Sequence, residues 1–287
     1  MTQSLCRLDD FKDNCGFGMI AQVKGKTSHK LLLNAIQALT CMTHRGGVAA
    51  DGKTGDGCGL LMQKPDSFLR TVVKESLKLD LPEAYAVGAV MLNTDPEARG
   101  TAKTVIEEEL INQGLDIIGW REVPTDNDCL GPIAIESLPA FEQIFVGPGD
   151  ITDEKKFSAR LYMGRRKAEI RLEGDDSFHI ASLGTNILSY KGLMMPVDLP
   201  GFYLDLADER LETAICVFHQ RFSTNTMPRW PLAQPFRMLA HNGEINTIVG
   251  NRNWSVARTP KYKTALLPDL IEAAPLVNRT GSDSSSL

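Results

Sequence analysis

The order of predicted strands and helices is the feature that most limits the folds open to this chain of 287 residues. Apolar periodicity predicts helices over residues 28–44, 101–114 and 153–173. It predicts strands over residues 57–64, 85–93, 115–124, 143–148, 178–190 and 212–222. Several of these strands therefore follow one another without a helix between them, whereas simple βαβ units alternate the two throughout. The sequence predicts a mixed α+β domain with a sizeable core.

Local signals support several of these elements. Ser28 is suited to cap the helix over residues 28–44, and the glycine pair at 46–47 stops it. Residues 153–173 are rich in arginine, lysine and glutamate, and are predicted to form a solvated helix. Residues 235–258 are predicted to form a strand, a tight turn and then a helix.

The composition argues against several classes of function. The net charge is −5 and no block of basic residues occurs, so nucleic acid is not an expected partner. Polar residues interrupt every apolar run before the roughly 18 residues needed to span a bilayer, and residues 1–14 contain no apolar signal region. We therefore expect a cytoplasmic protein with no membrane partner. The 6 cysteines match no zinc or iron–sulfur spacing, so no metal site is expected.

Residues 47–54, GVAADGKT, formally match the phosphate-binding P-loop pattern. A P-loop lies between a strand and a helix, but here a helix is predicted before the motif. The glycine-rich residues 55–59, GDGCG, follow it and disfavour a helix. We interpret the segment as a loop that lies close to another part of the backbone. A P-loop nucleotide binder is the alternative.

Cys15 differs from the other cysteines in its neighbours, DNCGFG. Gly16 and Gly18 let a substrate and the backbone approach closely, which benefits a reactive thiol and not a buried one. No histidine lies beside Cys15 to act as a base. If residues 1–14 were removed as a propeptide, Cys15 would carry a free α-amine with a pKa of about 7.7–8.0. That amine would serve as the base for its own thiol.

Other polar residues match the groups of an amino-acid ligand. Arg221 and Thr224 follow a predicted buried strand, and a guanidinium there can hold a carboxylate. Asn242 and Gly243 form a predicted turn, where a side-chain amide and a backbone N–H can make an oxyanion hole. Asp283 lies at a predicted helix start and can hold an ammonium group.

Each of these residues also has a plain structural interpretation: a surface arginine, a tight turn and a helix N-cap. Taken together with Cys15, they describe a site for an α-amino acid with a side-chain carboxamide. Attack of a thiol on that carboxamide gives a thioester and ammonia. The predicted ligand is glutamine or asparagine.

Longer stretches of the sequence resemble a known family. The stretches are CGFGMIA, HRGGVAADGKTGDGCGLLMQKP, the segment from LPGFYLDLADERLE to GNRNW, and GSDSSSL. They are similar to the N-terminal part of the large subunit of glutamate synthases, over nearly all of residues 15–287. More broadly, the chain resembles class II glutamine amidotransferases, which are N-terminal-nucleophile hydrolases with a four-layer αββα fold.

The resemblance implies a role for each candidate residue. It implies a mature N-terminal Cys15, Arg221 on the glutamine carboxylate, Thr224 in contact with substrate, Asn242 and Gly243 as oxyanion donors, and Asp283 on the α-amine. L-glutamine is then the substrate, and residues 1–14 are a propeptide. A catalytically silent amino-acid-binding module is the alternative from another class.

The resemblance also implies parts outside residues 1–287. In glutamate synthases later domains carry FMN, an iron–sulfur cluster and the 2-oxoglutarate site, and a small subunit supplies electrons, here expected from NADPH. No cofactor is expected within residues 1–287. The domain over 15–287 is expected to be incomplete at its C-terminus, because GSDSSSL would begin a helix that it does not build. We expect the isolated fragment to be weakly active.

Overall fold

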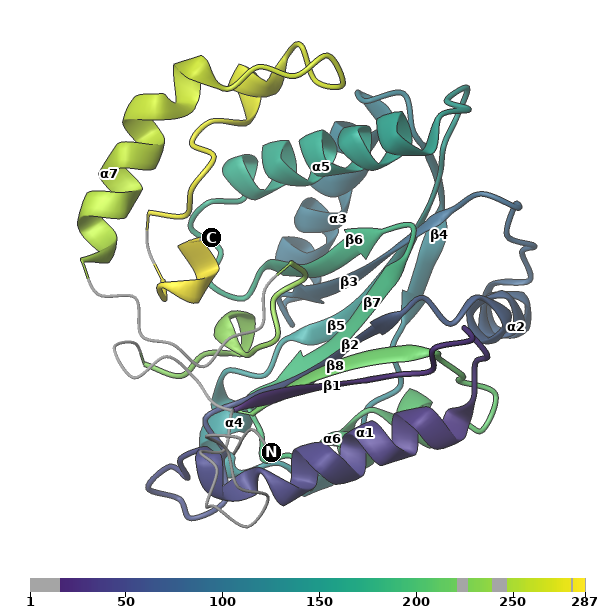
Figure 1. Ribbon diagram of the computed structural model, residues 1–287, viewed down its shortest axis with the longest axis vertical. Coiled ribbons are helices and arrows are strands. Elements are labelled where there is room, and N and C mark those ends of the chain that lie inside the picture. Colours follow the sequence, from purple (N-terminus) through teal and green to yellow (C-terminus); the bar gives the residue numbers. More distant parts are fainter. Residues whose placement is uncertain (1–15, 221–226, 239–246, 280, 287) are drawn as a thin grey trace, which may run out of the picture.

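The structure is a computed structural model that describes residues 16–220, 227–238, 247–279 and 281–286 (Figure 1). Its strands are β1 (Phe17–Ala21), β2 (Cys58–Gln63), β3 (Ala86–Leu92), β4 (Asp116–Glu122), β5 (Ala140–Gly147), β6 (His179–Gly184), β7 (Ile187–Gly192) and β8 (Ile215–Gln220). Its α-helices are α1 (His29–Cys41), α2 (Asp66–Leu77), α3 (Pro96–Ile111), α4 (Pro132–Glu136), α5 (Glu154–Arg171), α6 (Leu199–Phe202) and α7 (Ile248–Arg258).

Side-chain caps fix where three of the helices begin. The Ser28 hydroxyl accepts from the N–H of Leu31 at 3.3 Å and starts α1. Asp95 caps α3 and Asp153 caps α5 in the same way, each accepting from the N–H three residues on. Such caps satisfy N–H groups that have no partner inside the helix. The sequence therefore determines these helix starts locally, before any tertiary packing.

The strands form two four-stranded sheets in which every pair is antiparallel. The first sheet has the order β1-β8-β2-β7 and the second has the order β4-β5-β3-β6. The hairpin of β6 and β7 joins them, because β6 pairs with β3 while β7 pairs with β2. Antiparallel pairing throughout both sheets agrees with the predicted α+β class.

The helices cover the outer faces of the two sheets (Figure 1). Helix α1 packs on β1 and β8 of the first sheet, while α3 and α5 pack on each other and on β4 and β6 of the second. The sheets contact each other through β3, β6 and β7. Helices therefore lie against both sheets, α1 against the first and α3 and α5 against the second.

Strand β3 shows how one strand serves both parts of the core. Ala86, Val90 and Leu92 belong to the apolar cluster that includes α3 and α5. Val87 and Met91 point the other way, into the larger cluster that α1, α2 and the first sheet share. Because side chains alternate along a strand, one apolar run is buried on both faces.

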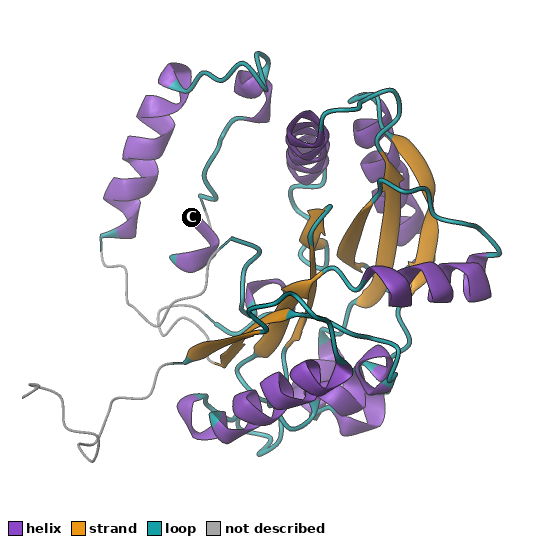
Figure 2. Cartoon of the chain, turned by 45° about the vertical axis from the view of Figure 1, so that its right-hand side comes forward, coloured by secondary structure: helices purple, strands orange, loops and turns teal. Residues whose placement is uncertain are grey.

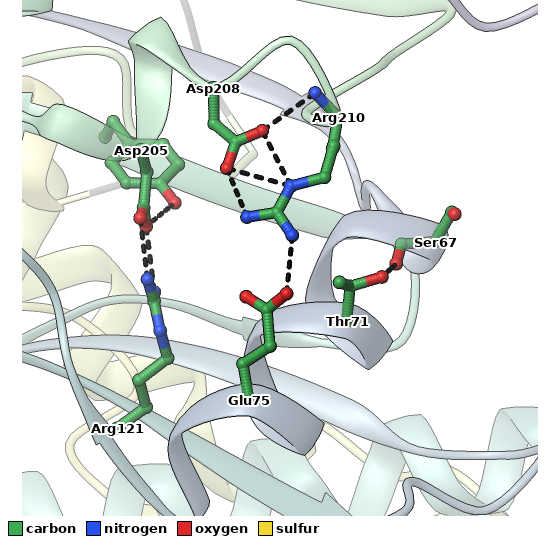
Figure 3. A network of polar contacts seen from close by, with 8 residues as sticks. Ser67, Thr71, Glu75, Arg121, Asp205, Asp208 and Arg210 are labelled. Atoms are coloured by element: carbon green, nitrogen blue, oxygen red, sulfur yellow. Dashed lines mark hydrogen bonds and ion pairs between the residues drawn. The ribbon is translucent and has the colours of Figure 1, made fainter.

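A buried polar network joins the two sheets, and Figure 3 shows its Arg121–Asp205 pair. The Arg121 guanidinium on β4 donates to both Asp205 oxygens, at 2.8 and 2.6 Å. It also donates to Gln143 on β5 at 2.9 Å, and Tyr190 on β7 donates to Asp205 at 2.8 Å. Gln143 donates to the Tyr190 hydroxyl at 3.2 Å. Burial acts to lower the pKa of Arg121, but the Asp205 carboxylate more than offsets it, so the pKa is raised.

Most of the predicted elements are present, with some corrections. The helix predicted over 153–173 is α5, but it is not simply solvated, because Phe157, Leu161 and Ala168 are buried against the second sheet and α3. Residues 235–238 form no strand, although a strand was predicted to begin there. Helix α2 and strand β1 were not predicted.

The glycine-rich loop after α1 lies close to backbone, as predicted. A Cβ placed on Gly55 would lie 2.6 Å from backbone atoms of Met194. Asp51 accepts from the Thr54 hydroxyl at 2.6 Å and from the N–H of Ile133 at 3.2 Å, at the start of α4. These hydrogen bonds lower the pKa of Asp51, that from Thr54 most. The loop leads into strand β2 and not into a helix, so the geometry argues against a P-loop.

Helix α7 and the C-terminal segment stand apart from the sheets (Figure 2). None of the α7 residues is buried. The Arg252 guanidinium on α7 donates to the carbonyls of Gly281 and Ser282 at 3.0 and 3.2 Å, and to the Ser286 hydroxyl. Helix α7 therefore holds the serine-rich turn that contains Asp283. Within the described residues, no helix is both long and apolar enough to cross a membrane.

Candidate active site

The chain segments that flank several of the predicted site residues lie together at one edge of the first sheet. Strands β1 and β2 begin at this edge, and β8 and β7 end there, as their antiparallel registers require. The last complete row of paired residues is Phe17, His219, Gly59 and Lys191. Paired residues in a row share one face of the sheet, and this face is the one opposite α1. The Phe17 and His219 rings stack with centroids 6.3 Å apart.

The start of β1 is bonded to the end of β8. The Gln220 N–H donates to the Gly16 carbonyl at 2.6 Å, and both residues are buried. Gly16 follows Cys15 in the sequence and Gln220 precedes Arg221. Cys15, Arg221, Thr224, Asn242 and Gly243 themselves lie outside the described residues.

Three of the other cysteines that the structure describes, Cys58, Cys129 and Cys216, differ from an activated thiol. Cys58 and Cys216 are buried, and burial raises the pKa of both, that of Cys216 to about 12. Burial also raises the pKa of Cys129, with the Asp198 carboxylate adding to the effect. A thiol with a raised pKa is a poor nucleophile, because the thiolate is the reactive form.

A segment from Trp230 to Phe236 crosses this edge above the sheet. A Cβ placed on Gly59 would lie 2.7 Å from the Gln234 carbonyl oxygen and 2.4 Å from the Lys191 Cβ. A Cβ on Gly192 would lie 2.5 Å from the Trp230 ring. The glycines of β2 and β7 therefore let the segment approach the sheet closely.

Lys191 fixes the same segment with its side chain. The lysine is only 1% exposed, and its ammonium donates to the Pro231 carbonyl at 2.9 Å. It also lies 4.7 Å from the centre of the Phe236 ring. Burial lowers the pKa of Lys191 to about 7, and the Arg237 guanidinium adds to the effect. Sequence reasoning missed Lys191; a lysine between apolar strand residues, in SYKGL, was the available signal.

Asp283 is the predicted site residue that the structure does describe. It is buried, 8% exposed, and its Oδ1 accepts from the N–H and the hydroxyl of Ser284, at 2.6 and 3.1 Å. The Gln234 amide donates to the Ser284 hydroxyl at 3.4 Å. Asp283 is thereby linked, through Ser284 and Gln234, to the segment that lies above Gly59.

The predicted N-cap role in this turn belongs to Ser282. Its hydroxyl accepts from the N–H of Ser285 at 3.1 Å, at the start of the short 3-10 turn Ser284–Ser286. Asp283 is thus a buried carboxylate, a type of group that can pair with a ligand ammonium group. Within the part of the chain that the structure describes, no cluster of three or more histidine, cysteine or acidic residues is placed to hold a metal ion.

The sequence comparisons define the class of protein. The family profile of class-II glutamine amidotransferases matches residues 15–287, that is, from Cys15 to the last residue. The chain belongs to this family.

Among curated relatives, the chain is similar to "Ferredoxin-dependent glutamate synthase 2" of Synechocystis, with 40% identity over 285 residues, which cover 96% of this chain and 18% of the relative. It is similar to "Glutamate synthase [NADPH] large chain" of Azospirillum brasilense, with 40% identity over 97% of this chain and 19% of the relative. The protein of the same name from Bacillus subtilis is 40% identical over 99% of this chain and 19% of the relative. The chain thus spans about a fifth of the length of these relatives.

Proposed function

We propose that this chain is the glutamine-hydrolysing part of a glutamate synthase. The observation that carries the proposal is the family match that begins at Cys15, together with the hydrogen bond that joins Gly16 to Gln220, the neighbours of Cys15 and Arg221. The proposal assigns L-glutamine as the substrate. Ammonia released here would pass to a site elsewhere in the longer protein, where 2-oxoglutarate is converted to glutamate.

The chemistry follows from the residue types. The Cys15 thiol attacks the carboxamide carbon of glutamine, and its proton passes to the α-amine of Cys15 after residues 1–14 are removed. Asn242 and the N–H of Gly243 stabilise the negative oxygen of the tetrahedral intermediate. The amine returns the proton to the leaving nitrogen, so ammonia departs and a thioester remains. Water then hydrolyses the thioester to glutamate and restores the thiol.

Arg221, Thr224 and Asp283 position the substrate in this proposal. Arg221 pairs with the glutamine carboxylate, Thr224 contacts the substrate, and Asp283 pairs with the α-ammonium group. The buried setting of Asp283 supports its role, because water screens a charge pair less in such a place. A ligand with a carboxylate and an ammonium group would pair with Arg221 and Asp283, and its carboxamide would be open to attack by Cys15.

The remaining parts of the enzyme belong to the same proposal. FMN, an iron–sulfur cluster and a small electron-supplying subunit would serve the synthase site, outside residues 1–287. NADPH is the proposed electron donor. The chain is 40% identical both to a ferredoxin-dependent relative and to relatives named for NADPH, so the donor stays a prediction.

Processing of the N-terminus tests the proposal. We expect the chain that begins at Cys15 to release glutamate from glutamine, and the chain that keeps residues 1–14 to be inactive, because the α-amine is then part of a peptide bond. Intact mass identifies each form and a glutamate assay gives its rate. Equal rates for both forms would reject the α-amine as base. Binding of glutamine without hydrolysis by the processed form would favour the silent amino-acid-binding module.

A further inference from the structure

Gln234 carries a buried acceptor that the rest of the described structure leaves unused. The side chain is 4% exposed, and its Oε1 has no hydrogen-bond partner among the described residues. The other end of the same amide donates to Ser284, so the side chain is held in one orientation. Buried carbonyl oxygens in folded proteins usually accept a hydrogen bond, and an unused one calls for a ligand or an ordered water.

The position of Gln234 indicates which ligand group this is. Its amide touches the Ser284 hydroxyl at 3.4 Å, and that hydroxyl touches Asp283 Oδ1 at 3.1 Å. The Gln234 side chain is therefore linked, through the Ser284 hydroxyl alone, to the carboxylate assigned to the α-ammonium group. A primary ammonium has three N–H donors, and a single carboxylate rarely accepts all of them.

Among the described residues, no cationic side chain donates to this acceptor. The Lys191 ammonium, from the adjacent strand, donates to the Pro231 carbonyl instead. Gln234 is itself fixed, because its backbone carbonyl lies against Gly59 and its amide against Ser284. A fixed neutral acceptor beside a carboxylate favours a primary ammonium group, which can donate to both.

We infer that Gln234 Oε1 is a second acceptor for the α-ammonium group of the amino-acid substrate, beside Asp283. The inference rests on the proposed function and adds a specificity residue to it. Gln234 would distinguish an α-amino acid from the same molecule without its amine. It takes no part in the bond-breaking steps.

The test compares two ligands that differ only in the amine. L-glutamine and 4-carbamoylbutanoate, which lacks the α-amino group, are titrated calorimetrically into the chain carrying Cys15→Ala, so that neither is consumed. The preference is the ratio of the two Kd values. A hydrogen bond to a charged group corresponds to a factor of about 10 to 100 in Kd. We expect Gln234→Met, similar in volume but without an acceptor, to lower the preference by about that factor.

Two further variants separate this role from a structural one. Gln234→Glu keeps an acceptor oxygen and should keep or increase the preference for L-glutamine. Gln63→Met makes the same exchange at an exposed position of β2 and should change nothing. Thermal unfolding checks that each variant is folded.

The outcomes are distinct. Loss of the preference in Gln234→Met, with its retention in Gln234→Glu, supports the inference. An unchanged preference in Gln234→Met overturns it and leaves the proposed function intact. If the parent chain binds neither ligand, the proposed function itself fails.

Discussion

Two buried polar clusters of this domain differ in how completely their hydrogen bonds are satisfied. Between the sheets, Arg121, Asp205, Gln143 and Tyr190 bond to one another, and Arg121 and Asp205 meet through two hydrogen bonds (Figure 3). At the edge where β8 ends, the side-chain oxygens of Gln220 and Gln234 are buried without a partner among the described residues.

The difference separates a structural cluster from a functional one. A fully paired network fixes one arrangement of the two sheets and leaves nothing for a ligand to bond. Unpaired buried groups destabilise the empty protein, and proteins concentrate such groups where function requires them. The edge with unused acceptors is the edge where the candidate site residues join the sheet. The predictions below test whether the two clusters behave as differently as their hydrogen bonds suggest.

The largest effect on stability is expected in the paired cluster. Asp205→Asn removes the charge that partners the buried Arg121 guanidinium, and breaking such a pair costs about 3–5 kcal/mol of unfolding free energy. Urea denaturation measures the change. The surface pair of Arg210 and Glu75 offers a matched control (Figure 3). Glu75→Gln should leave stability almost unchanged, and similar losses in both variants would contradict the assignment.

A pH dependence is expected from Lys191 at the candidate site. Its pKa is lowered to about 7 in the folded protein, from an ordinary value of 10.5. Between these values the unfolded chain binds the proton and the folded chain does not, so stability rises with pH from about 7 to 10.5. The slope reaches at most about 1.4 kcal/mol per pH unit.

Lys191→Met isolates this contribution. The difference in unfolding free energy between the variant and the parent should be largest near pH 7, in favour of the variant, and should shrink as the pH rises. Urea titrations at pH 7, 8 and 9 measure it. A difference that does not change with pH would mean that Lys191 keeps its ordinary pKa.

A smaller effect on stability is expected at Gly59, where the segment from Trp230 to Phe236 lies against the sheet. In Gly59→Ala the new Cβ would meet both Lys191 and the Gln234 carbonyl, and such overpacking costs about 1–3 kcal/mol. Gly100, inside α3, has no atom within 4 Å of the position of a Cβ. Gly100→Ala should therefore stabilise the protein by about 0.5–1 kcal/mol, through helix propensity alone. Thermal unfolding measures both variants. If their midpoint temperatures shift in the same direction, Gly59 is not at a close approach.

The sequence predicted the parts of this fold that depend on local signals. Helix α1 has its cap at Ser28 and an apolar stripe, so its start and its buried face could both be predicted. Helix α2 follows Pro65, which offers no side-chain cap, and it was missed. The charges of α5 suggested a solvated helix, but Arg165 and Arg166 pair with Glu169 while the apolar residues face the core.

The candidate site was predictable only in part, for a similar reason. Asp283 was predicted from its residue type and its small neighbours, and its role in the site stays a prediction. Lys191 and Gln234 could not, because their roles depend on β7 and the segment after Trp230 meeting at Gly59, a contact between residues far apart in the sequence. In the local sequence this close approach is marked only by Gly59 in β2 and Gly192 in β7.

The rate of glutamine hydrolysis by Cys15→Ala tests the central claim most directly. The processed parent chain and the variant are incubated with L-glutamine, and released glutamate is measured. Cys41→Ala is the matched control, since Cys41 is an exposed free thiol. The account predicts that Cys15→Ala loses hydrolysis to background while Cys41→Ala keeps the parent rate. A parent-like rate in Cys15→Ala would show that another residue is the nucleophile, and would contradict the account.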